Sequence, residues 1–136
     1  MEPRTKKRGA RAIILREGKI LLGKRLKKDS FYGLWCTFGG SVESGETPEQ
    51  ALIRELAEEL GIRIMDPVLL TVSETVTEEQ PPEAVQLHFF LVRAWKGKIV
   101  NKSEHSEIRW FHLNSLKDLP MGRIGKKVID KYLTKH

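Results

Sequence analysis

The sequence predicts a single α+β domain, a mixed-sheet sandwich with one central and one C-terminal helix. Segments with strand-like patterns dominate the chain, and they do not alternate with helices as they would in repeated βαβ units. The length of 136 residues, with 40% hydrophobic residues, suits one domain with its own core. We therefore treat residues 1–136 as one domain.

The first elements form a hairpin followed by an irregular segment. We predict a buried strand at residues 10–15 and its partner at residues 19–24, joined by a turn at Glu17-Gly18. The polar and aromatic residues 27–33 are expected to form a loop. Residues 35–42 are predicted as a short strand or a loop that leads into a helix.

The best-defined element is a helix at residues 48–60. Thr47 is a favourable N-cap and Gln50 completes a capping box with it. Pro48 suits the first helical position, and Gly61 is a natural C-terminal stop.

The C-terminal half shows the same kinds of signal, with turns at Pro81-Pro82 and Lys96-Gly97. We expect strands at residues 67–77, 84–95 and 107–113, a short helical turn at 114–119 and a terminal helix at 125–133.

Composition limits the classes of function. No apolar run is long enough to cross a membrane. The single Cys36 can form neither an intramolecular disulfide nor a thiolate zinc cluster, so the cytoplasm is the expected compartment. The net charge of +6 favours anionic partners such as nucleotides. Part of the excess lies at Arg11 and before it, and we interpret residues 1–8 as a flexible, solvated basic tail, not a nucleic-acid site.

Three glutamates of the predicted helix share one face. With Glu55 at zero on a helical wheel, Glu59 lies at about +40° and Glu58 at about −60°. The wheel puts the apolar residues Ile53, Leu56, Ala57 and Leu60 on the opposite side. Such crowding of like charges is unfavourable, and a divalent cation would relieve it, because carboxylate oxygens are hard ligands that Mg²⁺ prefers. The alternative is a solvated acidic face without a ligand.

The segment before the helix favours the metal site over that alternative. Gly39-Gly40 and Gly45-Glu46 bracket a short loop, in which glycines allow the backbone to approach a ligand closely. Glu46 lies just before the positive end of the helix, where the N–H groups and Arg54 can hold it.

Together these residues resemble the box of the Nudix hydrolase family, of the MutT-like kind. The pattern is matched at Gly40, Glu46, Arg54, Glu55, Leu56, Glu58, Glu59, Gly61 and Ile62. It covers about a sixth of the chain, and one departure is that Phe38 stands where many relatives have proline before the two glycines. The resemblance implies an α/β/α sandwich, with a mixed β-sheet between the box helix and a C-terminal helix.

The resemblance also implies roles for the box residues. Glu58 and Glu59 would be the main Mg²⁺ ligands, with Glu55 as a further ligand or the base for water, and Mn²⁺ can substitute. Arg54 and Glu46 would be orienting groups, and the backbone carbonyl of Gly40 a further metal contact.

Family members often take another acid from a distant loop. MutT-like relatives carry a metal-binding or base glutamate at a place that matches Glu104, with Glu107 as the alternative here. His105 is a third candidate for the base, although a loop histidine is more often a bystander.

Substrate contacts are expected outside the box. Arg25, preceded by Lys24, could hold phosphates, and aromatic residues near the glycine loop could stack on a base or shape its site. These aromatic residues are Phe31, Tyr32, Trp35 and Phe38.

The predicted reaction is Mg²⁺-dependent hydrolysis of a phosphoanhydride bond in a nucleoside diphosphate derivative. We expect a (d)NTP to give a monophosphate and pyrophosphate, with ADP-ribose or a nucleotide sugar as the alternative substrates. An alternative of another class is a non-catalytic nucleotide- or RNA-binding module. The expected partner is the small nucleotide itself, without a membrane, and the resemblance allows a homodimer.

Overall fold

The computed structural model describes residues 4–26, 33–76, 80–102 and 105–133. Within them, seven strands form one mixed sheet with the order β3-β2-β1-β7-β6, in which β4 also pairs with β1 and β9 with β2. β1 runs parallel to β7, and the other pairs are antiparallel. These strands are β1 (Arg4–Arg16), β2 (Lys19–Arg25), β3 (Trp35–Cys36), β4 (Phe38–Ser41), β6 (Val68–Val76), β7 (Glu83–Val92) and β9 (His105–His112). A second sheet pairs β5 (Arg63–Met65) with β8 (Ala94–Lys96).

The central strand β1 contributes to both hydrophobic cores of the protein. Successive strand residues point to opposite faces of a sheet. Ala10, Ala12 and Ile14 accordingly lie in one core, and Ile13 and Leu15 in the other. The sheet is therefore covered on both faces, as its parallel β1–β7 pair requires.

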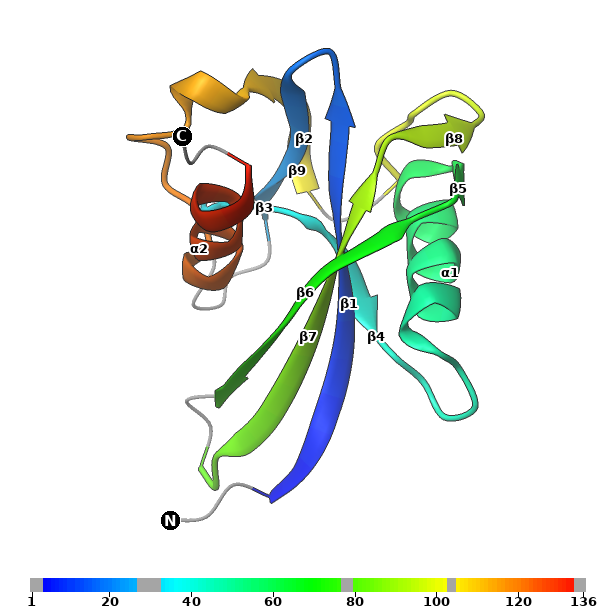
Figure 1. The fold of residues 1–136 in the computed structure, drawn as a ribbon, viewed down its shortest axis with the longest axis vertical. Helices are drawn as coiled ribbons and strands as arrows, with labels where there is room; N and C mark the ends of the chain where they lie inside the picture. The colour runs from blue at the N-terminus through cyan, green and yellow to red at the C-terminus, as the bar shows by residue number, and fades with distance from the viewer. Residues whose placement is uncertain (1–3, 27–32, 77–79, 103–104, 134–136) are drawn as a thin grey trace.

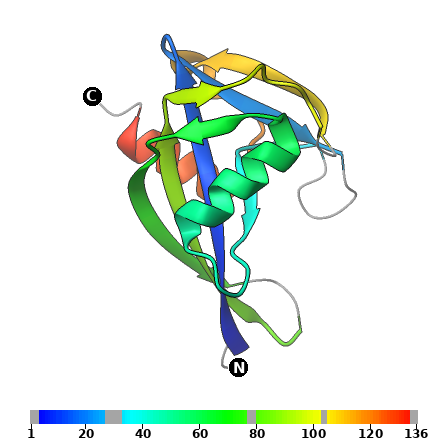
Figure 2. The ribbon, with the colours of Figure 1, turned by 90° about the vertical axis from the view of Figure 1, so that its right-hand side faces the viewer.

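Two helices supply those covers, and they lie on opposite sides of the sheet (Figures 1 and 2). α1 (Pro48–Leu60) packs on one core, and α2 (Arg123–Tyr132) on the other. The predicted capping box of Thr47 and Gln50 is confirmed, and Gly61 ends α1 with a left-handed φ of 70°. The predicted α/β/α sandwich is confirmed.

The first strand is longer than we predicted. β1 begins at Arg4, and its first residues pair with β7, so the expected flexible tail at residues 1–8 is wrong for residues 4–8. The Nζ of Lys7 lies 3.1 Å from the Oε1 of Glu83 on β7. A partner strand so distant in sequence leaves no local signal, which explains the error.

The small sheet was also missed. The predicted strand at residues 84–95 is divided at Arg93 into β7 and β8. The three-residue strand β5 is too short for a periodic pattern, and it is defined by its pairing with β8. A 3₁₀ turn at Leu113–Ser115 lies at the start of the predicted helical turn. In the part of the chain that the structure describes, no helix is long and apolar enough to span a membrane.

Candidate active site

The three box glutamates that lie on α1 (Glu55, Glu58 and Glu59) differ in exposure. Side-chain exposure is 60% for Glu58 and only 17% for Glu55, and Glu59 is half-buried. Two of the three carboxylates are thus turned towards the sheet and away from solvent.

The glycines of β4 make room for these two carboxylates. The backbone N–H of Gly39 donates to Oε1 of Glu59 over 3.1 Å. A Cβ added to Gly40 would lie within 3.0 Å of the carboxyl carbon and both oxygens of Glu55. Glu55 therefore packs directly against the backbone of Gly40, which only glycine permits.

This arrangement corrects the helical wheel. Ala57, expected in the apolar face, is exposed, whereas Ala51 and Leu52 are buried. The buried face is therefore rotated towards Glu55 and Glu59, and it is not opposite to them. The wheel assumed that charges seek solvent, whereas Gly39 and Gly40, which lack side chains, leave room for two carboxylates at the edge of the core.

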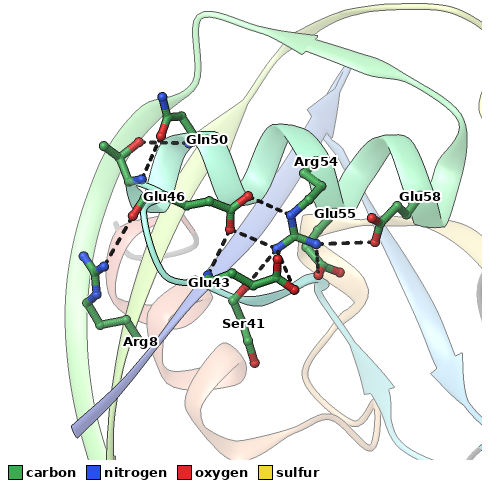
Figure 3. A network of polar contacts seen from close by, with 9 residues as sticks. Arg8, Ser41, Glu43, Glu46, Gln50, Arg54, Glu55 and Glu58 are labelled. Carbon is green, nitrogen blue, oxygen red and sulfur yellow. Dashed lines mark hydrogen bonds and ion pairs between the residues drawn. The ribbon is translucent and has the colours of Figure 1, made fainter.

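Arg54 connects the acids of the site (Figure 3). It forms a bidentate pair with Glu46, with Nε at 2.7 Å from Oε2 and Nη2 at 3.1 Å from Oε1. Nη1 donates to Glu55 over 2.9 Å and lies 3.5 Å from Glu58, and Nη2 donates to the carbonyl of Ser41 over 3.0 Å. The hydrogen bonds from Arg54 lower the pKa of Glu46, and the bond with Glu46 in turn raises the pKa of Arg54. The expected contact between Arg54 and Glu46 is confirmed.

Glu46 also fixes the glycine loop. Its Oε1 accepts from the backbone N–H of Glu43 over 2.9 Å, and its carbonyl accepts from Arg8 on β1 over 3.3 Å. Figure 3 shows these contacts at the start of α1. The loop is thus tied both to the helix and to the central strand.

Burial raises the pKa of Glu59 to about 7. The positive charge of Arg11 opposes this shift, and the negative charges of Glu55 and Glu58 add to it. Glu59 is difficult to ionise and lies next to two further carboxylates. A bound cation would stabilise its ionised form, as expected for a metal site.

Sequence reasoning missed Arg11, which we had counted with the basic N-terminal charges. Its Nε donates to Oγ1 of Thr37 over 3.1 Å, and its Nη2 donates to the Thr37 carbonyl. Burial lowers the pKa of Arg11, and the negative charge of Glu59 partly offsets that effect. Arg11 therefore supports the strand that leads into Gly39 and faces Glu59 from β1. The one signal was its place between Ala10 and Ala12 in a predicted buried strand.

The donor chemistry of the site fits a hard divalent cation. Three carboxylates and the carbonyl of Gly40 supply oxygen ligands only, as Mg²⁺ prefers, together with water and substrate phosphate. Within the described residues, no three His, Cys, Asp or Glu side chains are gathered closely enough to hold an ion by themselves. Glu104, the expected further acid, lies outside the described residues.

The raised pKa of Glu59 leads to a stability prediction for the metal-free protein. A raised carboxyl pKa means that ionisation opposes folding, and this loss develops between about pH 4.5 and pH 7. In EDTA, Glu59→Gln should therefore raise the free energy of unfolding by about 1–3 kcal/mol at pH 8. The gain should shrink as the pH falls from 8 to 4.5, because Glu59 becomes protonated first in the folded state and, below about pH 4.5, in the unfolded state as well. Urea unfolding at both pH values measures the difference, and an equal gain at both would contradict the assignment.

Two predicted substrate contacts are corrected, because they belong to the cores. Phe38 is completely buried in the α1-side core. Trp35 is 6% exposed in the α2-side core, where its ring meets Phe111 edge-on at 4.8 Å. Neither side chain offers a free face to a nucleotide base. The aromatic pattern before the glycine loop reflects packing at both positions, and Phe31 and Tyr32 lie outside the described residues.

The remaining candidates lie around the end of β2. Arg25 ends that strand, and its positive charge lowers the pKa of Arg11, so the two guanidinium groups are electrostatic neighbours. Glu107 pairs with Lys24 across β2 and β9 and accepts from Arg109 over 2.7 Å. His105 packs its ring edge-on against Phe38 at 5.0 Å. These contacts show that Glu107 and His105 lie next to β2. A role of either residue as the general base stays a prediction.

Comparison with known proteins finds similar sequences of one family. The family model of the NUDIX domain matches residues 5–132 of this chain. An 8-oxo-dGTP diphosphatase of Proteus vulgaris is 39% identical over 93 residues, which cover 68% of this chain and 80% of that protein. A CTP pyrophosphohydrolase of Escherichia coli (strain K12) is 40% identical over 102 residues, which cover 73% and 70%.

A solved structure shares the whole architecture. The crystal structure of a MutT NUDIX hydrolase from Burkholderia pseudomallei superposes with a TM-score of 0.83 at 29% identity. The match covers 93% of this chain and 98% of that one.

Proposed function

The chain belongs to the Nudix family and is a hydrolase of nucleotide derivatives, and from this premise we propose that it cleaves a nucleoside triphosphate with the help of Mg²⁺. The products would be a nucleoside monophosphate and pyrophosphate.

One observation carries this proposal. Glu55 and Glu59 are held half-buried against the backbone of Gly39 and Gly40, next to the exposed Glu58. Arg54 pairs with Glu46 and Glu55 at the same time, which orients both carboxylates. A purely solvated acidic helix would not bury two carboxylates against a sheet.

Nudix hydrolases generally use divalent metal ions, and we propose Mg²⁺ here, with Mn²⁺ as a substitute. Glu55, Glu58 and Glu59 would hold it together with the Gly40 carbonyl, and Glu104 would be an additional ligand or base. A bound metal ion would neutralise phosphate charge and lower the pKa of a water molecule bound to it.

Side chains of the protein then orient the reacting groups and accept the proton of the attacking water. We propose that Glu55 takes the proton of the attacking water at the carboxylate oxygen that Arg54 leaves open, since Arg54 donates to Oε2. Arg25 would bind the phosphate chain. Its neighbour Arg11 would hold Thr37, the residue that precedes β4, in place near Glu59.

Two similar proteins support a triphosphate substrate, because their names specify 8-oxo-dGTP and CTP. ADP-ribose and nucleotide sugars stay the alternative substrates. The non-catalytic alternative is not retained, because the family match and these pyrophosphohydrolases identify the chain as an enzyme.

A Mg²⁺-dependent turnover panel tests the substrate. It would contain the dNTPs, CTP, 8-oxo-dGTP, ADP-ribose, GDP-mannose and a dinucleoside polyphosphate, with pyrophosphate and phosphate measured separately. We expect pyrophosphate release from triphosphates and no release in EDTA. Activity on ADP-ribose or GDP-mannose alone would overturn the substrate and keep the mechanism.

A further inference from the structure

A cavity of about 320 Å³ lies beyond the C-terminal end of α1. It is lined by Trp95 of β8, Trp110 of β9, Arg16 and Lys98, together with apolar side chains such as Leu21. None of the lining residues belongs to the box or to the glycine loop. This volume is at the lower end of the range for small-ligand sites.

The two tryptophans form one stacked aromatic pair, which we call the platform. Their rings are nearly parallel, with an interplanar angle of 22° and centroids 6.2 Å apart. Both side chains are only half-buried and pack against the α1-side core, whereas Trp35 is 6% exposed within the other core. The guanidinium of Arg16 lies 4.6 Å from the centroid of Trp95 and 5.2 Å from that of Trp110.

The polar groups at this cavity are positive or hydrogen-bond donors. Among the described residues, neither Arg16 nor Lys98 pairs with a carboxylate, and neither indole N–H of the platform donates to a protein acceptor. Arg16 and Lys98 are both exposed, so their charges can turn towards a ligand at little steric cost. The contact of an exposed Arg16 with the rings is weak and exchangeable.

We propose that this cavity binds a nucleotide, with its base stacked on the platform of Trp95 and Trp110 and its phosphate held by Arg16 and Lys98. Every base has a π-face that stacks on an indole, and an arginine displaced from the ring becomes a bidentate partner for phosphate. The site is separate from the carboxylates of α1, and it does not depend on the proposed reaction.

AMP is the probe for the test. It would be titrated in EDTA into a Glu58→Gln/Glu59→Gln variant, so that binding at the catalytic carboxylates is suppressed and no turnover occurs. Calorimetry gives the Kd, and quenching of tryptophan fluorescence reports on the platform. We expect saturable binding that is weakened about tenfold by Trp110→Leu and by Arg16→Gln. Adenosine should lose less than AMP on Arg16→Gln, because it lacks the phosphate.

The matched control is Arg93→Gln, an exposed arginine between β7 and β8 that does not line the cavity. Arg16 is exposed, so Arg16→Gln keeps the test valid if Trp110→Leu does not fold. Unchanged AMP affinity in Arg16→Gln, or equal affinity for ribose 5-phosphate and AMP, would overturn the proposal. Binding that disappears in the Glu58→Gln/Glu59→Gln background but is present in the parent protein would also overturn it, because AMP would then bind only at the catalytic site.

Discussion

A Glu58→Gln/Glu59→Gln variant is expected to lose kcat by roughly 10²–10⁴-fold, with the fold intact. Metal ions contribute several kcal/mol to transition-state stabilisation at phosphoryl oxygens, and each 1.4 kcal/mol or so is tenfold in rate. Glutamine keeps the side-chain shape and an oxygen that can accept from the Gly39 N–H, but it removes the charge that binds the cation. Turnover on the best triphosphate of the panel, measured across a Mg²⁺ titration, gives the loss.

Glu49→Gln is the matched control on the same helix. Glu49 lies in the first turn of α1 and is exposed, and it has no contact with the glycines of β4. The Glu49→Gln substitution removes one charge from the helix without changing the site, so kcat should stay within about twofold of the parent value. If Glu49→Gln lost as much activity as the double variant, the effect would be one of helix charge and the assignment of ligands would fail.

Gly40→Ala is expected to lower kcat/KM by roughly 10²-fold while the protein still folds. The new methyl group would occupy the place of the Glu55 carboxyl, which lies within 3.0 Å of it. That carboxyl is the end of a flexible side chain, so it can swing away, and stability falls little. Its contact with Arg54 would be lost, and misplacement of about 1 Å in a catalytic group can cost two orders of magnitude.

Gly39→Ala separates this effect from general damage to the sheet. A Cβ on Gly39 would collide with the backbone carbonyl of Ala10, and Gly39 has a φ of 148° that side chains rarely adopt. We therefore expect a loss of about 3 kcal/mol or more in unfolding free energy, because a backbone clash cannot be relieved by a rotamer change. If Gly40→Ala melted as low as Gly39→Ala, its loss of activity would carry no information about Glu55.

The helix and its caps could be predicted because their signals are local. Thr47, Gln50 and Gly61 specify the ends of α1 through contacts within the helix and its flanking residues. The order of acids and glycines also brought Glu46 and Arg54 together correctly. These features depend on residues close in sequence, which one chain displays directly.

The features that were missed depend on contacts between distant segments. The rotation of Glu55 and Glu59 towards the sheet follows from the lack of side chains at Gly39 and Gly40 of β4, which a helical wheel does not contain. The role of Arg11 depends on its register opposite Gly39 in the β1–β4 pair. The sequence pattern predicts Phe38 and Trp35 as substrate contacts because an aromatic residue before a glycine loop has the same pattern whether it faces a ligand or a core.

The placement of β1 in both cores links the two halves of the molecule. Ile13 and Leu15 support the α2 layer, and Ala10, Ala12 and Ile14 support the α1 layer, all from one strand. Neither layer can melt without exposing the other side of that strand, so the domain should unfold as a single cooperative unit. A ligand bound on the α1 face should therefore raise the melting temperature recorded by Trp35, which lies across the sheet from it.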